Sequence, residues 1–403
     1  MEQPPLKRIR SERSPAGSEN DGTVQSRENP VDSNIYLTYD ILRIVFRYLN
    51  GRDLASAAMV CRLWLEAANN EKCTRSPHCF MEYYKPPVSL NGIKDSKIKP
   101  SIGFFFIPEN TPLNIEGYIL DLLPQNCVAI MLYTSGIVMN NIEMEYHAFP
   151  NIVCAFLPQI PNVTINAFKV TEKYLLPILQ SGKRSRTVEY QEFIKVVDET
   201  SIPNHDRSTC LMLFCNYSGH HRAMLFASTI QKSQEDGITS LWGGVVEDVY
   251  TQHIHSNNPY ARKKELISGR RNPYCLAVLI TGPIQTWSTV VDKKCRTKEQ
   301  VEVKLRLFRD QVKLKKHSMG FMFACKARGT TMYNEEKNVE STIFKTLFPT
   351  VPLVGCFGDG EFGKNTMPVD EMEKKTRSKK KQKAYINSLY NEFSTMFMIL
   401  TYG

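Results

Sequence analysis

The sequence predicts an α+β protein in which a small three-helix module precedes a mixed α/β body built from two halves. Two observations lead to this prediction. Apolar residues between 34 and 72 recur at helical spacing, and short apolar runs typical of buried strands alternate with helical stretches later in the chain. The 403 residues are 42% hydrophobic and 10% aromatic, which is enough for two or three units with buried cores. We find no internal repeat in the sequence.

Composition excludes several classes of protein. No apolar run approaches the ~20 residues that a membrane helix needs, and the polar first residues do not form a signal peptide, so we expect an intracellular protein without membrane contact. The eleven cysteines are odd in number and scattered, which indicates reduced thiols rather than a disulfide framework. The net charge of +10 is concentrated in residues 292–316 and 371–383. Because no nucleic-acid-binding fold accompanies this charge, we do not predict a nucleic-acid partner.

Residues 1–30 form a polar tail with five basic and five acidic side chains. Such a composition cannot bury enough apolar surface to order the chain, so we expect disorder. Two basic clusters are candidates for nuclear import signals, and both are equally compatible with a plain solvated segment. They are Lys7, Arg8 and Arg10 in the tail and Lys379, Lys380 and Lys381 in a loop at 371–383. On this basis we expect the protein in both cytoplasm and nucleus.

Residues 34–72 change character abruptly and predict the helical module. The first helix is indicated by apolar residues at Ile41, Leu42, Val45, Phe46 and Leu49. Asn50-Gly51 ends it, and Asp53 is the expected N-cap of the next helix because its carboxylate can accept the free amides of a first turn. That helical stretch carries Leu54, Ala57, Met59, Val60 and Trp64.

The remainder predicts a linker and then the two halves of the body, at 85–265 and 266–403. Residues 73–100 contain four prolines and several lysines and are interpreted as a linker or irregular entry. Val301, Leu305, Phe308 and Val312 form one stripe of an amphipathic helix. Buried strands are predicted at Gly103–Ile107, Cys127–Tyr133, Leu211–Cys215, Cys275–Ile280, Gly320–Cys325 and Phe393–Tyr402.

The segment from 36 to 66 resembles an F-box. The residues that carry the resemblance are Leu37, Ile41, Leu42, Tyr48-Leu49, Asp53-Leu54, Val60-Cys61-Arg62 and Trp64. One departure is Thr38, where the family usually has proline, and it affects only the start of the first helix. Independently of the family, a unit of ~40 residues buries too little surface to be robust alone, and an apolar excess on it is best explained by a partner helix. The alternative is a helical subdomain packed on the body.

The resemblance implies that this segment docks on a Skp-type adaptor and through it on a cullin-RING ubiquitin ligase. The rest of the chain then selects protein substrates for ubiquitination and proteasomal degradation, and the chain itself performs no bond chemistry. The residues expected to bind the adaptor are Leu37, Ile41, Leu42, Val45, Leu49, Leu54, Val60, Cys61 and Trp64.

The C-terminal part resembles a FIST domain, a module named for F-box and intracellular signal transduction proteins. The matching motifs are Gly320–Cys325, Phe348-Pro349 with Pro352-Leu353, and Gly358-Asp359-Gly360-Glu361 with Gly363. The resemblance extends over roughly 200–403 and is faint between 85 and 200. It implies a FIST-like body in both halves and offers an alternative function, a signalling module that senses a small ligand.

Four residues are candidates for contact with a ligand or substrate: Cys325, Gly358, Asp359 and Gly360. Glycines let backbone amides approach an anion, but the turn lacks the Lys-Ser/Thr of a P-loop, and a tight turn between strands explains it equally. Lys326 and Arg328 could lower the pKa of the Cys325 thiol, although a structural thiol is the simpler interpretation. No complete set of metal ligands or catalytic groups is recognisable, so we expect no metal, no cofactor and no enzyme.

Overall fold

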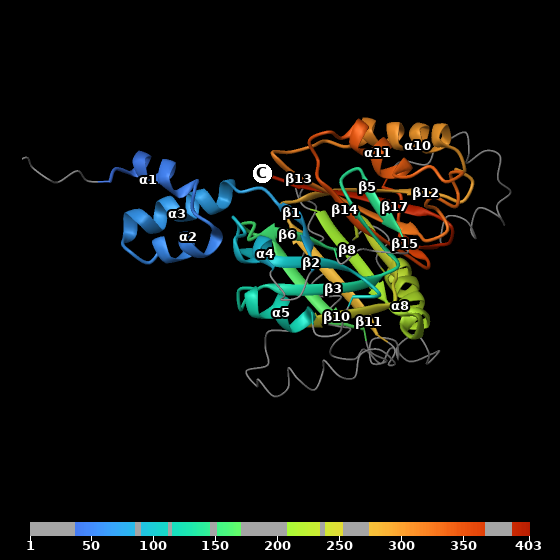
Figure 1. The fold of residues 1–403 in the computed structure, drawn as a ribbon, viewed down its shortest axis with the longest axis horizontal. Helices are drawn as coiled ribbons and strands as arrows, with labels where there is room; N and C mark the ends of the chain where they lie inside the picture. The colour runs from blue at the N-terminus through green and yellow to red at the C-terminus, as the bar shows by residue number, and fades with distance from the viewer. Residues whose placement is uncertain are drawn as a thin grey trace, which may run out of the picture.

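The computed structural model describes residues 37–84, 90–111, 115–145, 151–170, 208–233, 238–252, 274–366 and 389–403. A helical module lies at one end of a larger sheet-rich body (Figure 1). The predicted α+β class is confirmed. None of the helices in the described part of the chain combines the length and apolarity that crossing a membrane requires.

The module contains α1 (Tyr39–Phe46), α2 (Gly51–Ala57) and α3 (Arg62–Thr74). The N-cap of α2 is Asn50, whose side-chain oxygen accepts the Asp53 amide at 2.8 Å. The Asp53 carboxylate in turn accepts a hydrogen bond from the Asn50 amide group. The prediction of Asp53 as N-cap was therefore wrong, because Asn50 caps the first turn and the helix begins three residues earlier than predicted.

The first sheet has the strand order β1-β6-β2-β3-β10. Short helices α4 (Asn91–Lys94) and α5 (Ile115–Leu122) pack on its outer face. Because β1 and α4 fall within 73–100, part of the predicted linker is regular structure. The strands are β1 (His78–Tyr83), β2 (Pro100–Pro108), β3 (Val128–Thr134), β6 (Asn151–Pro158) and β10 (Asp248–Gln252).

The second sheet has the order β16-β15-β9-β8-β11-β7. Its outer face is covered by α8 (His220–Ser233), which follows a single 3₁₀ turn, η1 (Tyr217–Gly219). The strands are β7 (Thr164–Lys169), β8 (Ser208–Cys215), β9 (Ser240–Val245), β11 (Cys275–Gly282), β15 (Glu361–Gly363) and β16 (Tyr390–Asn391).

The third sheet has the order β12-β17-β13-β14-β4-β5. Helices α10 (Lys298–Gln311) and α11 (Val339–Leu347) cover its outer face, and a capping box of Thr297 and Gln300 begins α10. The strands are β4 (Gly136–Met139), β5 (Ile142–Glu145), β12 (Gln285–Val291), β13 (His317–Cys325), β14 (Leu353–Gly358) and β17 (Thr395–Tyr402).

The three sheets share one topological plan. Each is built on a parallel pair whose strands are joined through a helix: β2 with β3, β8 with β9, and β13 with β14. The next strand along the chain leaves for another sheet, so that β4 joins the third sheet, β10 the first and β15 the second. The body thus consists of three similar units that exchange strands in a closed ring. The boundary expected at 265/266 lies inside the second unit, between β10 and β11.

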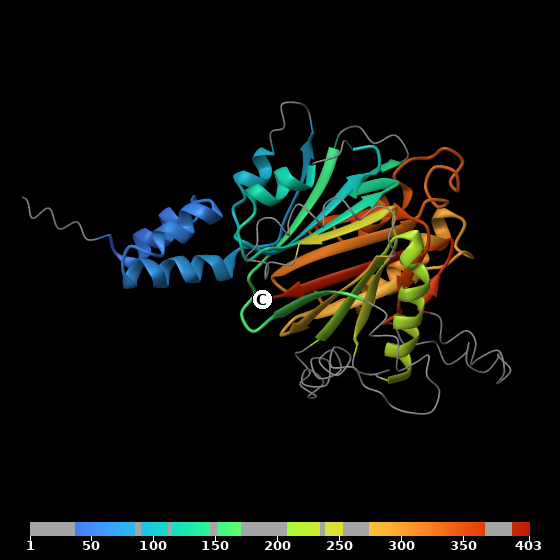
Figure 2. The ribbon, with the colours of Figure 1, turned by 90° about the horizontal axis from the view of Figure 1, so that it is seen from below.

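The inner faces of the three sheets meet in one central core. Alternate residues of each strand point there, as in β2, where Phe104 and Phe106 face the centre while Phe105 faces the outer helices. The fully buried Trp242 ring lies 5.2 Å from the Phe321 ring and 6.5 Å from the Phe106 ring, centroid to centroid, which joins all three sheets. In Figure 2 the sheets are seen enclosing this region, with α8 on the outside.

The apolar runs identified in the sequence all lie in described elements of this core. The six predicted strands correspond to β2, β3, β8, β11, β13 and β17, and the predicted amphipathic helix is α10, with Val301, Leu305 and Phe308 buried.

A candidate docking face on the helical module

The three helices of the module enclose a small core. Its fully or nearly fully buried members are Leu42, Phe46, Leu54, Ala57, Ala67 and Ala68. The Phe46 ring contacts the edge of the Trp64 ring at a centroid distance of 5.4 Å. This core uses one side of each helix, so most of the remaining surface of α1 and α3 faces solvent, while α2 also contacts the body.

Arg75, at the end of α3, ties the module together. Its Nη2 donates to the carbonyl oxygens of Phe46 and Leu49, both at 2.8 Å, and its Nε donates to Glu71 at 3.1 Å. The Phe46 and Leu49 carbonyls lie at and just beyond the end of α1, where helical carbonyls lack partners within the helix. The end of α3 therefore caps the end of α1 and fixes the angle between the two helices.

Gly51 joins the module to the body. Its amide donates to the Ser96 carbonyl at 2.9 Å, and a Cβ at this position would lie 2.5 Å from the carbonyl carbon of Ile98. Only glycine permits this approach, so the glycine that separates α1 from α2 also seats the module on the loop after α4.

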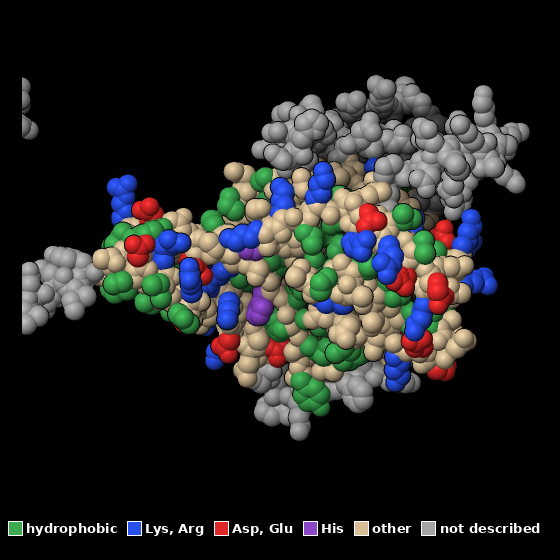
Figure 3. All heavy atoms as spheres, turned by 90° about the horizontal axis from the view of Figure 1, so that it is seen from above, with side chains coloured by type: hydrophobic (Ala, Val, Ile, Leu, Met, Phe, Trp, Pro, Cys, Tyr) green, Lys and Arg blue, Asp and Glu red, His purple; other side chains and the backbone are tan. Residues whose placement is uncertain are grey.

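Nine large hydrophobic residues of the module are exposed, and we call this set the apolar face. The most exposed are Tyr48 (84%), Met59 (81%) and Val60 (61%). Five members of the set follow α1 and the residues on either side of it at helical spacing, and the other four lie at the turn between α2 and α3 and on the first turn of α3. Figure 3 shows hydrophobic side chains on the surface of the module, with charged side chains among them. The apolar face comprises Leu37, Ile41, Ile44, Val45, Tyr48, Met59, Val60, Leu63 and Leu65.

An apolar surface of this density on so small a unit is typical of a protein-docking site. Soluble domains scatter single hydrophobic residues over their surface, whereas here nine of them share one small module. Tyr39 on the same helix is half-buried and is approached by the Arg43 guanidinium at 6.0 Å. The arrangement can bury a partner helix or strand.

The residues predicted to bind an adaptor divide into three groups. Leu37, Ile41, Val45, Val60 and Cys61 are exposed, and they are the ones available to a partner. Leu49 and Trp64 are half-buried, whereas Leu42 and Leu54 belong to the module core. The last two therefore act on docking only by supporting the helices.

The sequence-based list omitted four members of the apolar face, Ile44, Met59, Leu63 and Leu65. It also left out Tyr48, although this residue was part of the motif. Helical spacing from Leu37 and Ile41 would have indicated both: Ile44 follows Ile41 by three residues, and Tyr48 follows Ile44 by four. The residues of the α2–α3 turn carry no periodic signal, because a turn breaks the repeat.

Cys325 lies at the end of β13 and is buried. Burial raises the pKa of its thiol, and the nearby Glu361 carboxyl raises this pKa further. The expected lowering by Lys326 and Arg328 does not occur, because Lys326 pairs with Asp359 at 2.5 Å and Arg328 pairs with Glu340 at 2.5 Å. The hypothesis of a thiolate activated by neighbouring cations was wrong on this geometry.

Gly358, Asp359 and Gly360 form the turn between β14 and β15. A Cβ at Gly358 would lie 2.3 Å from the Val245 carbonyl oxygen, and Gly360 has a φ of +133°, so both positions require glycine. These contacts are with neighbouring chain, as the interpretation of a tight turn predicts. A ligand at this turn stays a prediction.

The ends of the parallel strands converge near this turn, which the sequence did not reveal. Lys326 follows β13, and its Nζ contacts both the Asp359 carboxylate after β14 and the Tyr217 hydroxyl after β8. Tyr217 donates to Glu247, which follows β9, at 3.3 Å. Burial raises the pKa of Glu247 and of Asp359, and in both cases Glu109 after β2 adds to the effect. One polar network thus spans all three units.

The other features considered in the sequence give less support for a functional site. Among the described residues, no three His, Cys, Asp or Glu side chains gather closely enough to hold a metal ion. All eleven cysteines are free thiols. The import-signal candidates Lys7, Arg8, Arg10, Lys379, Lys380 and Lys381 lie outside the described residues, as does the tail at 1–30.

Comparison with known proteins agrees with the geometry of the module. An F-box-like family model matches residues 39–79, which covers α1 to α3. F-box only protein 22 from Homo sapiens is 21% identical over 384 residues, which is 85% of this chain and 87% of that protein. The same protein from Pongo abelii matches to the same extent. The chain thus contains an F-box-like domain and resembles F-box only protein 22 over most of its length.

Among solved structures, cyanuric acid hydrolase from A. caulinodans covers 81% of this chain and 99% of its own, at 8% identity and a TM-score of 0.35. This likeness is too low to carry an argument about fold or activity. The F-box-like domain and the F-box relatives support a substrate-recognition adaptor in general, and such adaptors are generally not catalytic.

Proposed function

We propose that the chain is the substrate-recognition subunit of an SCF-type ubiquitin ligase. The module binds a Skp-type adaptor and through it a cullin-RING ligase, and the body selects protein substrates for ubiquitination and proteasomal degradation. The chain itself catalyses no reaction in this proposal. Action in both cytoplasm and nucleus is part of the proposal and depends on the basic clusters near residues 7–10 and 379–381.

The observation that carries the proposal is the apolar face within the segment that matches the F-box-like model. The module encloses its own core and is seated on the body through Gly51, and yet nine large hydrophobic residues point to solvent. Burying them against a partner removes apolar surface from water at roughly 25 cal/mol per Å². A polypeptide partner explains this exposure better than packing within the chain does, because the residues that the structure describes fold without covering it.

The direct test is co-purification with the Skp-type adaptor. The double variant Ile44→Asp with Val60→Asp places charges on two exposed members of the apolar face, so it should abolish adaptor binding while leaving the fold intact. Leu54→Ala is a poorer test because Leu54 is a core residue, and its loss would unfold the module instead of probing the surface.

The matched control is Val303→Asp, which changes an equally exposed valine on α10 of the body. It should bind the adaptor as the wild type does. Equal adaptor binding by the wild type and the double variant would refute the proposed docking face, and absence of binding by the folded wild type would refute the adaptor role.

Substrate selection and turnover need a second experiment. Affinity purification is performed with cullin neddylation or the proteasome blocked, and the wild type is compared with the double variant. Proteins captured by both forms, and ubiquitinated only with the wild type, are the expected substrates. If no captured protein changes its ubiquitination between the two forms, the proposed role in degradation is wrong.

A further inference from the structure

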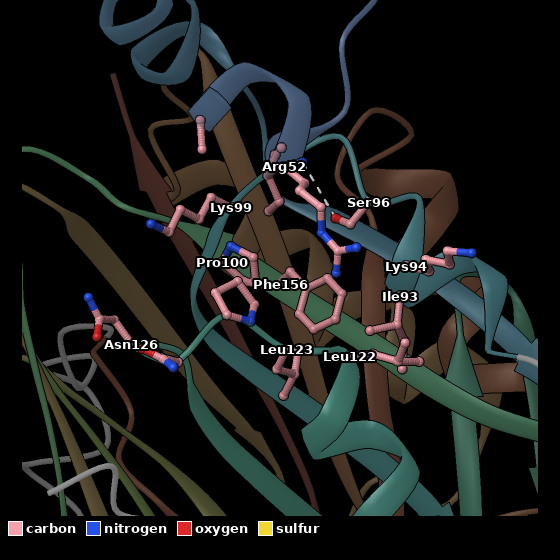
Figure 4. A pocket seen from close by; sticks show the side chains of 15 residues that line it. Arg52, Ile93, Lys94, Ser96, Lys99, Pro100, Leu122, Leu123, Asn126 and Phe156 are labelled. Carbon is pink, nitrogen blue, oxygen red and sulfur yellow. Dashed lines mark hydrogen bonds between the residues drawn. The ribbon is translucent and has the colours of Figure 1, made fainter. Parts of the chain in front are cut away.

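A cleft of about 350 Å³ lies at the junction between the module and the body. Gly51, Arg52 and Ala55 of α2 form one wall, and the other twelve lining residues come from the body (Figure 4). Clefts of this size hold a few side chains or a small molecule. Neither the apolar face nor the strand-end network of Lys326 contributes to the lining.

The charge of this cleft is uncompensated. Arg52, Lys94 and Lys99 line it and are exposed, and no Asp or Glu is among the lining residues. Within the part of the chain that the structure describes, none of these three cations forms an ion pair. Burial and then the charge of Lys99 lower the pKa of the nearby Lys72 on α3, so like charges crowd this junction.

The three cationic groups do not converge on one point. In Figure 4, Arg52 extends into the middle of the cleft, while Lys94 and Lys99 point to opposite sides. One compact anion would draw such groups together, whereas an extended acidic chain can meet each in turn. Below them the cleft has an apolar floor of Ile93, Pro100, Leu122, Leu123 and Phe156, which suits an apolar side chain of the same segment.

We propose that this cleft binds an extended acidic segment of the protein substrate, with an apolar side chain between its carboxylates. The proposal rests on the function proposed above. A substrate-recognition subunit must contact its substrate, and we assign that contact to this cleft. The substrate is favoured over the adaptor because the body supplies most of the lining. A segment held here lies directly beside α2, so recognition occurs close to the module that connects to the ligase.

The test measures binding of a short fluorescein-labelled peptide of glutamates with one central leucine to the full chain in complex with the Skp-type adaptor. The wild type should bind, and the triple variant Arg52→Glu, Lys94→Glu, Lys99→Glu should bind about tenfold more weakly or not at all. Binding should weaken as salt rises, because the Debye length falls from about 30 Å at 0.01 M to about 8 Å at 0.15 M.

The matched control is Lys293→Glu, Lys313→Glu, Lys337→Glu, which makes the same change in net charge at exposed lysines flanking α10 and α11. It should bind the peptide as the wild type does. Equal loss in both triple variants would mean attraction to net charge alone and would overturn the proposal. A labelled single-stranded oligonucleotide of equal charge that binds more tightly than the peptide would overturn it in favour of nucleic acid.

Two further outcomes separate this proposal from the adaptor role. If the cleft variant loses the adaptor itself, the cleft belongs to the adaptor interface and the assignment to substrate is wrong. The chain without adaptor provides the second readout. If Ile44→Asp with Val60→Asp binds the peptide normally, the cleft is independent of the docking face, and if it loses the peptide, the cleft depends on that face and the proposal fails.

Discussion

The helical module and the body bury their apolar residues in different ways. The module encloses only six buried hydrophobic residues and leaves nine large ones exposed, whereas each sheet of the body is packed on both faces, by the central core and by its own helices. Central strands such as β11 and β17 are buried along their whole length. This difference is the one expected if a protein partner covers the module, as proposed above, whereas the body buries its own apolar surface.

The same contrast appears in the polar contacts. In the module, buried hydrogen bonds of side chains come mainly from Arg75, which caps α1. In the body, the buried Arg328 bonds Glu340, the Tyr333 hydroxyl and backbone carbonyls from two other segments. A single substitution can therefore lower the free energy of unfolding of the body much more than that of the module. The following predictions test this contrast, from the largest expected effect to the smallest.

The largest effect is expected at Arg328. Arg328→Ala leaves the Glu340 carboxylate buried without its charge partner, so the body should lose about 3–5 kcal/mol of unfolding free energy. Chemical denaturation followed by tryptophan fluorescence measures this loss. Arg306→Ala, which breaks an exposed pair with Glu302, should cost only a few tenths of a kcal/mol. A similar cost for both would contradict the role assigned to the buried network.

Leu54→Ala should affect the module alone. Removing this core side chain costs about 2–4 kcal/mol, and because the module core is so small, α1 to α3 should open locally. Hydrogen exchange should accelerate across residues 39–74 and stay unchanged in β13 and β17. Leu305→Ala, in the core beneath α10, should show the opposite distribution. Loss of protection in both regions from either variant would show that the two parts do not unfold separately.

The body should become less stable as pH rises from 5 to 8. Burial raises the pKa of Glu143 to about 7 and that of Glu361 to about 8, so the folded state holds protons that the unfolded state releases near pH 4.5. Stability is then lost as pH rises, by about 1.4 kcal/mol per pH unit for each carboxyl while the two states differ by a full proton. Urea midpoints across this range measure the slope. Glu143→Gln should flatten it, and an unchanged slope would contradict the assignment.

The smallest effect is expected at Asn50. Asn50→Ala removes the N-cap of α2 and should cost the module about 1 kcal/mol. Hydrogen exchange of the α2 amides should rise modestly, and Asn50→Ser, which restores a capping oxygen, should recover most of the protection. No difference between the alanine and serine variants would mean that the contact of Gly51 with Ser96 alone holds this helix in place.

The sequence predicted those elements whose buried residues form an uninterrupted run or a regular stripe. Leu211–Cys215 is an uninterrupted apolar run because β8 is covered on both faces, and the stripe of Val301, Leu305 and Phe308 is regular because α10 is covered on one. Strands with exposed positions, such as β5 and β7, gave no clear pattern. The ring of three units could not be predicted, because pairs such as β4 with β14 join segments more than 200 residues apart.

For the candidate site, the motif ending in Val60-Cys61-Arg62 and Trp64 located the module, but not the orientation of its side chains. Ile41 and Leu42 are neighbours of equal hydrophobicity, and only the packing of α1 against α3 decides that Leu42 is inside and Ile41 outside. The alternative of an activated Cys325 thiolate, which the sequence left open beside a structural thiol, fails for a related reason. Its charged neighbours were visible in the sequence, whereas their partners Asp359 and Glu340 became neighbours only in the fold.

The exchange of strands around the ring has a consequence for biosynthesis. β17 lies between β12 and β13, and β15 pairs with β9 in the sheet that contains β8. Two of the three sheets therefore cannot be completed until residues beyond 360 have been synthesised. During translation the nascent chain therefore exposes long hydrophobic strands without their neighbours, and such exposed strands are prone to aggregation. The contacts of the module described above reach no further along the chain than Lys99, so the module can form first, which would offer a docking face to the cell before the body exists.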